Sequence, residues 1–319
     1  MAATIRETRL DLAAHAAGEV APWLACRESC PPDPNAPLLI FLHGFPEAAF
    51  VWDGMLAHFG KHYRCVAPNL RGYPGSYAPA KVGAYRAQVV LMDLIQLIQA
   101  HHGPAAAVIA HDWGGALAWG LAAVAPQTMQ RLVILNAPHP GLFLKALRDD
   151  PAQQAASQYM NVLRQDDAET ALQAQHLKPM WSFFEHFGGA GWLTSALREQ
   201  YRQAWTIAPT GPDTLPPGHL ATSALTGPLN YYRASPLHPP TSPQDPIHTL
   251  TLPDGLLHVN VPTTVVWGEA DTALPPTLLE GLDQFVSDLH IDRIPDATHW
   301  LVHEAPAAVI QSIEAALAR

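Results

Sequence analysis

The chain has 319 residues, of which 48% are hydrophobic, and its 18 Lys and Arg against 28 Asp and Glu give a formal net charge of −10. This acidic balance, without any Lys/Arg cluster, excludes nucleic acid as a partner because nucleic-acid binding needs clustered positive charge. A chain of this length can bury a sizeable core as one large or two modest domains. An odd number of cysteines, three, predicts free thiols in a cytoplasmic protein.

The sequence predicts no contact with a membrane. The first ten residues lack the continuous apolar stretch of a signal peptide, and Gly120 interrupts the longest apolar run, residues 116–125. We therefore expect a monomer or a homodimer in the cytoplasm.

Alternating strand and helix patterns predict an α/β fold. Four short apolar runs, at 38–43, 105–110, 131–135 and 263–267, are typical of strands buried on both faces. Helical periodicity lies between them, notably over 88–100 and 114–125. Such alternation predicts a mostly parallel central sheet flanked by helices.

The middle of the chain has a different pattern. The strand signal disappears near residue 141 and resumes at 261, with helical stretches around 151–178 and 191–206 and an irregular Pro-rich tract from 236 to 253. We therefore predict a mainly helical cap inserted into the sheet domain. The boundaries are 1–140 and 258–319 for the core domain and 141–257 for the cap.

Asp112 is the candidate nucleophile. It follows a buried strand and precedes a helix, with Ala110 and Gly114 two positions away on either side, which is the frame of a strained nucleophile elbow. A carboxylate is ionised at neutral pH and can attack a saturated carbon to form an ester that water then cleaves. The substrate class therefore shifts from acyl compounds to epoxides or alkyl halides. The alternative is that Asp112 merely caps the helix.

Three other segments supply the expected partners of Asp112. His43-Gly44-Phe45-Pro46 follows a predicted strand, and the backbone N–H groups of Phe45 and Trp113 are the predicted oxyanion hole. Asp271 after the strand 263–267 is the predicted orienting acid, with Glu269 as its rival, and His299 is the predicted base, with His303 as its competitor. We predict no metal at these two histidines, because they lack the frame of a zinc-binding helix.

These motifs resemble those of the soluble epoxide hydrolase family in the α/β-hydrolase superfamily. The resemblance spans nearly the whole chain and includes the segments 43–46, 111–115, 136–140, 229–233, 267–271 and 299–300. It implies a cofactor-independent enzyme that converts an epoxide and water into a diol. It also implies two cap tyrosines that donate to the epoxide oxygen: Tyr232, with Tyr231 as the local alternative, and Tyr159.

Two further expectations complete the sequence analysis. The substrate is expected to contact His43, Pro46, Trp113 and Trp181. The alternative function is a haloalkane-type dehalogenase, in which Trp113 and an indole from Trp181, Trp192 or Trp205 would bind the halide; a binding module without catalysis is a further alternative. Ala110 departs from the epoxide hydrolase pattern, which usually has glycine at that position.

Overall fold

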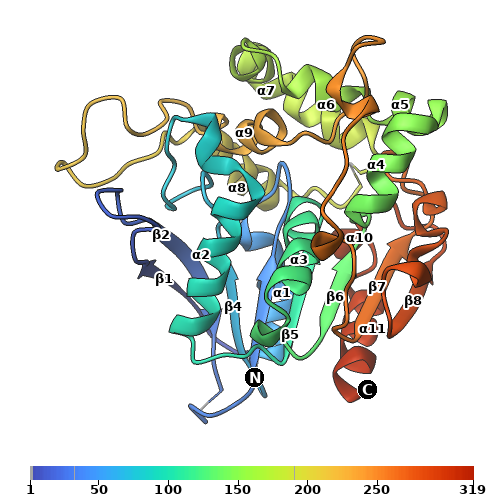
Figure 1. The fold of residues 1–319 in the computed structure, drawn as a ribbon. Coiled ribbons are helices and arrows are strands. Elements are labelled where there is room, and N and C mark those ends of the chain that lie inside the picture. The colour runs from blue at the N-terminus through green and yellow to red at the C-terminus, as the bar shows by residue number, and fades with distance from the viewer. Residues whose placement is uncertain (1–2, 32, 190) are drawn as a thin grey trace.

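A computed structural model describes residues 3–31, 33–189 and 191–319. An eight-stranded sheet with the order β1-β2-β4-β3-β5-β6-β7-β8 forms its centre (Figure 1). The strands are β1 Ile5–Asp11, β2 Trp23–Ser29, β3 Leu38–Leu42, β4 Arg64–Pro68, β5 Ala107–His111, β6 Leu132–Leu135, β7 Thr263–Gly268 and β8 Leu289–Ile294.

The sheet is parallel from β4 to β8, and only β2 pairs antiparallel with its neighbours β1 and β4. The four predicted strands correspond to β3, β5, β6 and β7, so the predicted α/β class and the mostly parallel sheet are confirmed. These strands are buried along their whole length, as their continuous apolar sequences require. The edge strands β1 and β8 are partly exposed and carry charged residues, so no apolar run revealed them.

Helices pack on this sheet. Figure 1 shows α2 (Ala87–Ala100) and α3 (Trp113–Val124) side by side in front of the strands. Both lie within one residue of the helical patterns predicted at 88–100 and 114–125. Helix α1 (Asp53–Phe59) and the C-terminal helix α11 (Pro306–Ala318) also contact strands, and the short α10 spans Leu301–Glu304.

The remaining α-helices belong to residues 141–257, which we call the cap segment, although the first of them begins one residue earlier. They lie above one edge of the sheet in Figure 1, and none of the cap residues that the structure describes forms a sheet strand. These helices are α4 Pro140–Asp149, α5 Pro151–Ala156, α6 Gln158–Leu163, α7 Ala168–His186, α8 Ser195–Thr206 and α9 Thr226–Ala234.

The helical stretch expected at 151–178 is divided into short pieces. Helices α5 and α6 each end after six residues, and α7 is interrupted where residues 175–177 adopt positive φ angles. Pro179 lies two residues after this interruption. A proline has no N–H to donate to the backbone oxygen four residues earlier, here Gln175, and its ring clashes with that oxygen, which favours a break at this point.

The parallel strands bring the candidate functional residues to one edge. Because β3, β5, β6 and β7 run in the same direction, the segments that follow them meet at the carboxyl ends of the strands, beneath the cap segment. Phe45, Asp112, Asn136 and Asp271 all lie in these segments. None of the helices in the described residues is long and apolar enough to cross a membrane.

Candidate active site

Asp112 lies on a strained turn between β5 and α3. Its φ of 50° and ψ of −120° belong to a region that residues with a side chain rarely adopt. Small residues make this turn possible. A Cβ on Gly114 would collide with the backbone oxygens of Leu42 and His43, and a Cβ on Gly44 would collide with the Asp112 carboxylate. The turn therefore presents the carboxylate at the sheet edge.

Two groups contact the Asp112 carboxylate from opposite sides. The Phe45 N–H donates to Oδ1 over 2.6 Å, and Nε2 of His299 lies 3.6 Å from Oδ2. Burial raises the pKa of Asp112, but the hydrogen bond and positive charge of His299 outweigh this effect and hold the pKa below its usual value. The carboxylate is therefore ionised at neutral pH.

His299 is held on its other side by Asp271. The distance from His299 Nδ1 to Asp271 Oδ2 is 2.8 Å, and the Asp271 carboxylate also accepts hydrogen bonds from the backbone N–H groups of Ala273 and Leu274. Asn136 donates its side-chain amide to Asp271 over 2.6 Å. The buried carboxylate is thus fully satisfied by donors, and it fixes the orientation of the imidazole.

The two carboxylates determine the charge of His299. Burial lowers its pKa, but the charge of Asp271 and the contact with Asp112 raise the pKa to about 10. The imidazole is therefore protonated at neutral pH while both carboxylates are ionised.

A cavity of about 700 Å³ adjoins Asp112, and Trp113, Tyr159 and Tyr232 line it. Burial raises the pKa of both tyrosines well above the usual value, so both hydroxyls keep their protons and can donate them. Tyr231 also borders the cavity, but its hydroxyl donates to the backbone oxygen of Arg71 over 2.9 Å. The Tyr232 hydroxyl instead accepts a hydrogen bond from the Trp113 side chain, so its own proton is available to a molecule in the cavity.

Comparisons with known proteins identify the family of this chain. Residues 37–306 match the family model described as the alpha/beta hydrolase fold. Epoxide hydrolase 3 of Xenopus tropicalis is 31% identical, over 87% of this chain and 70% of the relative. The AB hydrolase superfamily protein YfhM of Bacillus subtilis is 30% identical, over 88% of this chain and 89% of the relative. The chain belongs to the α/β hydrolase family.

Solved structures extend this result within the α/β hydrolases. One of the novel epoxide hydrolases from metagenomes of hot environments is 33% identical and covers 98% of this chain and 99% of its own, with a TM-score of 0.82. A variant of an epoxide hydrolase from Bacillus megaterium, at 24% identity, covers 93% of this chain and 98% of its own with a TM-score of 0.80, which shows the shared fold. The resemblance to epoxide hydrolases that the motifs predicted is confirmed.

Three residues expected at the substrate do not line the cavity of this α/β hydrolase. His43 is fully buried. Its Nδ1 donates a hydrogen bond to the Gly44 backbone oxygen, and its Nε2 accepts one from the Leu70 backbone N–H. The backbone oxygen of Pro46 accepts a hydrogen bond from the Trp205 indole N–H. The ring centroids of Trp181 and Trp205 are 4.7 Å apart. The hydrogen bond of Trp205 to Pro46 joins the cap segment to the loop after β3. Among the four expected contacts only Trp113 borders the cavity.

A buried polar cluster beside the site was not predicted from the sequence. Oε1 of Glu47 accepts from the Tyr201 hydroxyl and contacts Nε2 of His303, each over 2.7 Å, and Oε2 lies 3.2 Å from Nδ1 of His111. The other nitrogen of His111 donates to the backbone oxygen of His299 over 2.9 Å. Glu47 thus links the loop after β3 to β5, α10 and cap helix α8, and His111 extends this link to the backbone of His299. Its position directly after the 43–46 motif was the available signal.

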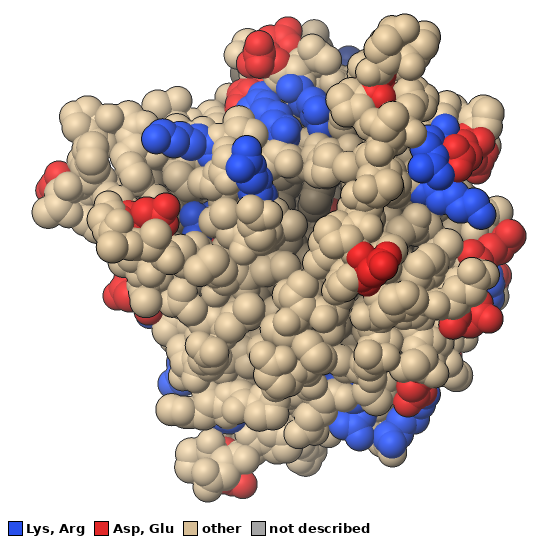
Figure 2. Space-filling view, viewed as in Figure 1, with Lys and Arg blue, Asp and Glu red and all other residues tan. Residues whose placement is uncertain are grey.

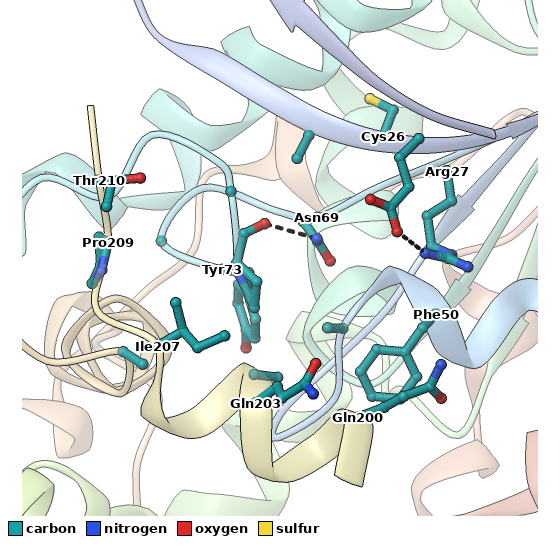
Figure 3. Close-up of a pocket in the computed structure, with 18 of the residues that line it drawn as sticks. Cys26, Arg27, Phe50, Asn69, Tyr73, Gln200, Gln203, Ile207, Pro209 and Thr210 are labelled. Atoms are coloured by element: carbon teal, nitrogen blue, oxygen red, sulfur yellow. Dashed lines mark hydrogen bonds and ion pairs between the residues drawn. The ribbon is translucent and has the colours of Figure 1, made fainter. Parts of the chain in front are cut away.

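A second cavity, of about 430 Å³, lies away from Asp112, between β2 and the C-terminal end of α8 (Figure 3). Its polar side chains are engaged with protein partners: Arg27 pairs with Asp53 and Glu7, and Asn69 donates to the Pro74 backbone oxygen. This cavity holds no group that resembles the Asp112 arrangement. Among the described residues, no cluster of three or more His, Cys, Asp or Glu side chains could hold a metal ion.

Proposed function

We propose that this α/β hydrolase is an epoxide hydrolase that opens an epoxide to a vicinal diol through a covalent ester of Asp112. The observation that carries the proposal is the placement of an ionised carboxylate and two protonated tyrosines around one cavity. A carboxylate needs an electrophilic carbon, and an epoxide oxygen needs a proton donor as the ring opens. The epoxide hydrolase relatives support the same substrate class.

In the first step, Oδ2 of Asp112 forms a bond to a ring carbon and the ring carbon–oxygen bond breaks. The ring oxygen takes a proton from Tyr232 or Tyr159. Oδ1 then becomes the ester carbonyl oxygen, and it remains at the Phe45 N–H, which donates to it in the resting enzyme. The Trp113 N–H is the proposed second donor, because it begins the helix that follows Asp112.

Ester formation also prepares His299 to act as a base. The ester is neutral, so the Asp112 charge that helped to raise the pKa of His299 disappears. The proton of His299 passes to the tyrosinate left by the first step. Neutral His299, still oriented by Asp271, then removes a proton from water as the water oxygen attacks the ester carbonyl. His299 returns this proton to the departing diol, and the Asp112 carboxyl group reprotonates His299.

The contacts of the cap tryptophans argue against the dehalogenase alternative. A halide site needs a second N–H beside Trp113. The Trp205 indole donates to the Pro46 backbone oxygen, and Trp181 packs against Trp205. The Trp192 ring stacks on the His303 ring, with 4.0 Å between the ring centroids. None of these three residues lines the cavity that holds Asp112. In addition, the Trp113 indole N–H donates a hydrogen bond to the Tyr232 hydroxyl oxygen.

The test compares two substrates in one assay. Purified protein is incubated with styrene oxide and, separately, with bromobutane, and diol and bromide are measured, with Asp112→Ala as the control. We expect diol from the epoxide, no bromide, and no product with the variant. Bromide release would support the dehalogenase instead. Diol formation that persists in Asp112→Ala would contradict the proposed nucleophile.

The covalent step has its own test. In His299→Gln the ester forms but no base activates water, so a substrate-sized mass should remain on the peptide that contains Asp112 after one turnover. The double variant with Asp112→Asn is the control for nonspecific alkylation. Continued turnover by His299→Gln without a trapped ester would contradict the proposed role of His299.

A further inference from the structure

The cavity that holds Asp112 extends beyond the catalytic side chains onto the outer surfaces of α2 and α3. Its distant part, which we call the outer arm, is bordered by Leu91, Met92, Ile95, Ala116, Gly120 and Val124. The proposed two-step reaction uses none of these side chains. The outer arm is therefore placed to contact the group attached to the epoxide ring, and it takes no part in ring opening.

Helix α3 forms the floor of the outer arm. Ala116, Gly120 and Val124 follow Asp112 at intervals of four residues, so they lie on one face of the helix, one turn after another. At a rise of about 1.5 Å per residue this face extends roughly 18 Å from the nucleophile. Two of its three residues have at most one side-chain carbon, which leaves space above the helix.

Gly120 is not needed for the fold. Of the three glycines in α3, Gly114 and Gly115 have no room for a Cβ, because backbone oxygens of β3 and the following loop or the Ala137 side chain would collide with it. A Cβ on Gly120 would instead make ordinary contact with Leu91 at 3.4 Å, and its φ is not in the left-handed region. Glycine within a helix costs stability relative to alanine. The open cavity above Gly120 gives a reason for its presence.

The outer arm suits an uncharged apolar group. All six residues that border it are apolar or glycine, and among the described residues Asp112 and Arg86 are the only charged ones that line the whole cavity. Met92 and Val124 are 39% and 47% exposed, although large hydrophobic side chains are usually covered. Figure 2 shows that the face over α2 and α3 is almost free of charged side chains, whereas Lys and Arg gather above it, towards the cap segment.

We propose that the outer arm binds an extended alkyl chain attached to the epoxide ring, and that Gly120 determines the length of chain that the enzyme accepts. The proposal rests on the epoxide hydrolase function proposed above. The continuity of the arm with Asp112 and Tyr232 in one cavity identifies the substrate itself as the occupant. The ring lies at Asp112, and the chain runs between Leu91 and Met92 of α2 and the Ala116–Gly120 face of α3.

The experiment compares a long and a short substrate in variants of Gly120. The terminal epoxide of dodecene is the long substrate, and propylene oxide is the short one. In Gly120→Leu we expect kcat/KM for dodecene epoxide to fall by roughly tenfold or more, because the new side chain occupies the arm. The value for propylene oxide should not change. Gly120→Ala should give a smaller loss for the long substrate and a raised Tm.

Gln99→Leu is the matched control, since it places a leucine on an exposed position of α2 outside the cavity. Equal values for both substrates in Gly120→Leu and the native protein, or an equal loss for both, would overturn the inference and leave the proposed function intact. A changed oligomeric state of Gly120→Leu without a change in selectivity would make the arm an interface between copies and also overturn it. If the native protein hydrolyses neither epoxide, the proposed function fails first.

Discussion

Tyr231 and Tyr232 are adjacent in α9, but their hydroxyl groups have different roles. The hydroxyl of Tyr231 donates to the Arg71 backbone oxygen, and that of Tyr232 is beside Trp113 at the cavity that holds Asp112. The Tyr232 ring also packs edge-on against Phe45, at 5.2 Å, so the same loop positions the nucleophile and the tyrosine. A single peptide unit thus separates a structural tyrosine from a proposed proton donor.

The first prediction follows from this difference. Tyr232→Phe should slow formation of the Asp112 ester by about a hundredfold, the usual effect of removing one donor to a developing oxyanion. Tyr231→Phe should leave ester formation unchanged and lower the free energy of unfolding by about 1 kcal/mol, the usual value for a lost hydrogen bond. Single-turnover kinetics with styrene oxide and urea titration measure the two effects. Equal rates in the two variants would remove Tyr232 from the mechanism.

The second prediction concerns Asn136, whose side chain connects β6 to Asp271, the proposed orienting acid. It donates to Asp271 and accepts from the Gly268 N–H, so both ends of the amide are engaged. In Asn136→Ala the Asp271 carboxylate loses a donor and the imidazole of His299 loses its fixed orientation. We expect ester hydrolysis to slow by roughly a hundredfold, as for other small misplacements of a catalytic group. Ester formation should change much less.

Rapid-quench measurements separate these two steps. If Asn136→Ala slows both steps equally, Asn136 supports the site as a whole rather than the base. The variant Asn136→Asp is a stricter test, because it keeps the size of the side chain but places a second carboxyl group against Asp271. It should impair hydrolysis more than alanine does.

The third prediction concerns the buried charge of Glu47. Burial raises its pKa, but hydrogen bonds from His111 and His303 hold the pKa well below the usual value, so the carboxylate is ionised. Glu47→Gln replaces the charged carboxylate with a neutral amide, so His111 and His303 lose the negative charge that they contact. Removing one partner of a buried ion pair costs about 3 to 5 kcal/mol, and we expect a loss of unfolding free energy in that range.

Urea titration measures the loss, and Glu280→Gln is the control because Glu280 is exposed. The control should change the unfolding free energy by less than about 0.5 kcal/mol. A Glu47→Gln protein that is as stable as the control would show that the cluster holds no net buried charge.

The sequence was sufficient to predict the residues that follow parallel strands. Asp112 and Asp271 follow apolar runs that are typical of buried strands, and in a parallel sheet such positions meet at one edge. The cap segment was less predictable, because α5 and α6 are short and α7 is interrupted at residues 174–177. The contact of Pro46 with Trp205 depends on how the cap meets the loop after β3, which no local pattern encodes.

The Glu47 cluster shows the same limit. Its members lie at positions 47, 111, 201 and 303. In the sequence each of them is close to a residue that the motifs identify more clearly as a candidate. His303 could be predicted only as a competitor of His299. In the structure it contacts Glu47 and stacks on Trp192, while Nε2 of His299 faces Asp112. Contacts between distant segments, and not spacing, distinguish the two histidines.

The last prediction is a pH dependence of stability that arises from His299. The pKa of this imidazole is about 10 in the folded protein, against a usual value of 6.5 in the unfolded chain. A group whose pKa is raised on folding binds its proton more tightly in the native state, so it stabilises that state below the unfolded pKa. This stabilisation is fully present below pH 6.5 and is lost as the pH rises towards 10.

His299→Gln has no such proton to lose. The difference in unfolding free energy between the native protein and this variant should therefore be largest near pH 6 and should shrink steadily towards about pH 10. Urea titrations of both proteins across this range give the difference directly, and His290→Gln controls for an exposed histidine. A difference that stays constant with pH would mean that the carboxylates of Asp112 and Asp271 do not hold a proton on His299 in the resting enzyme.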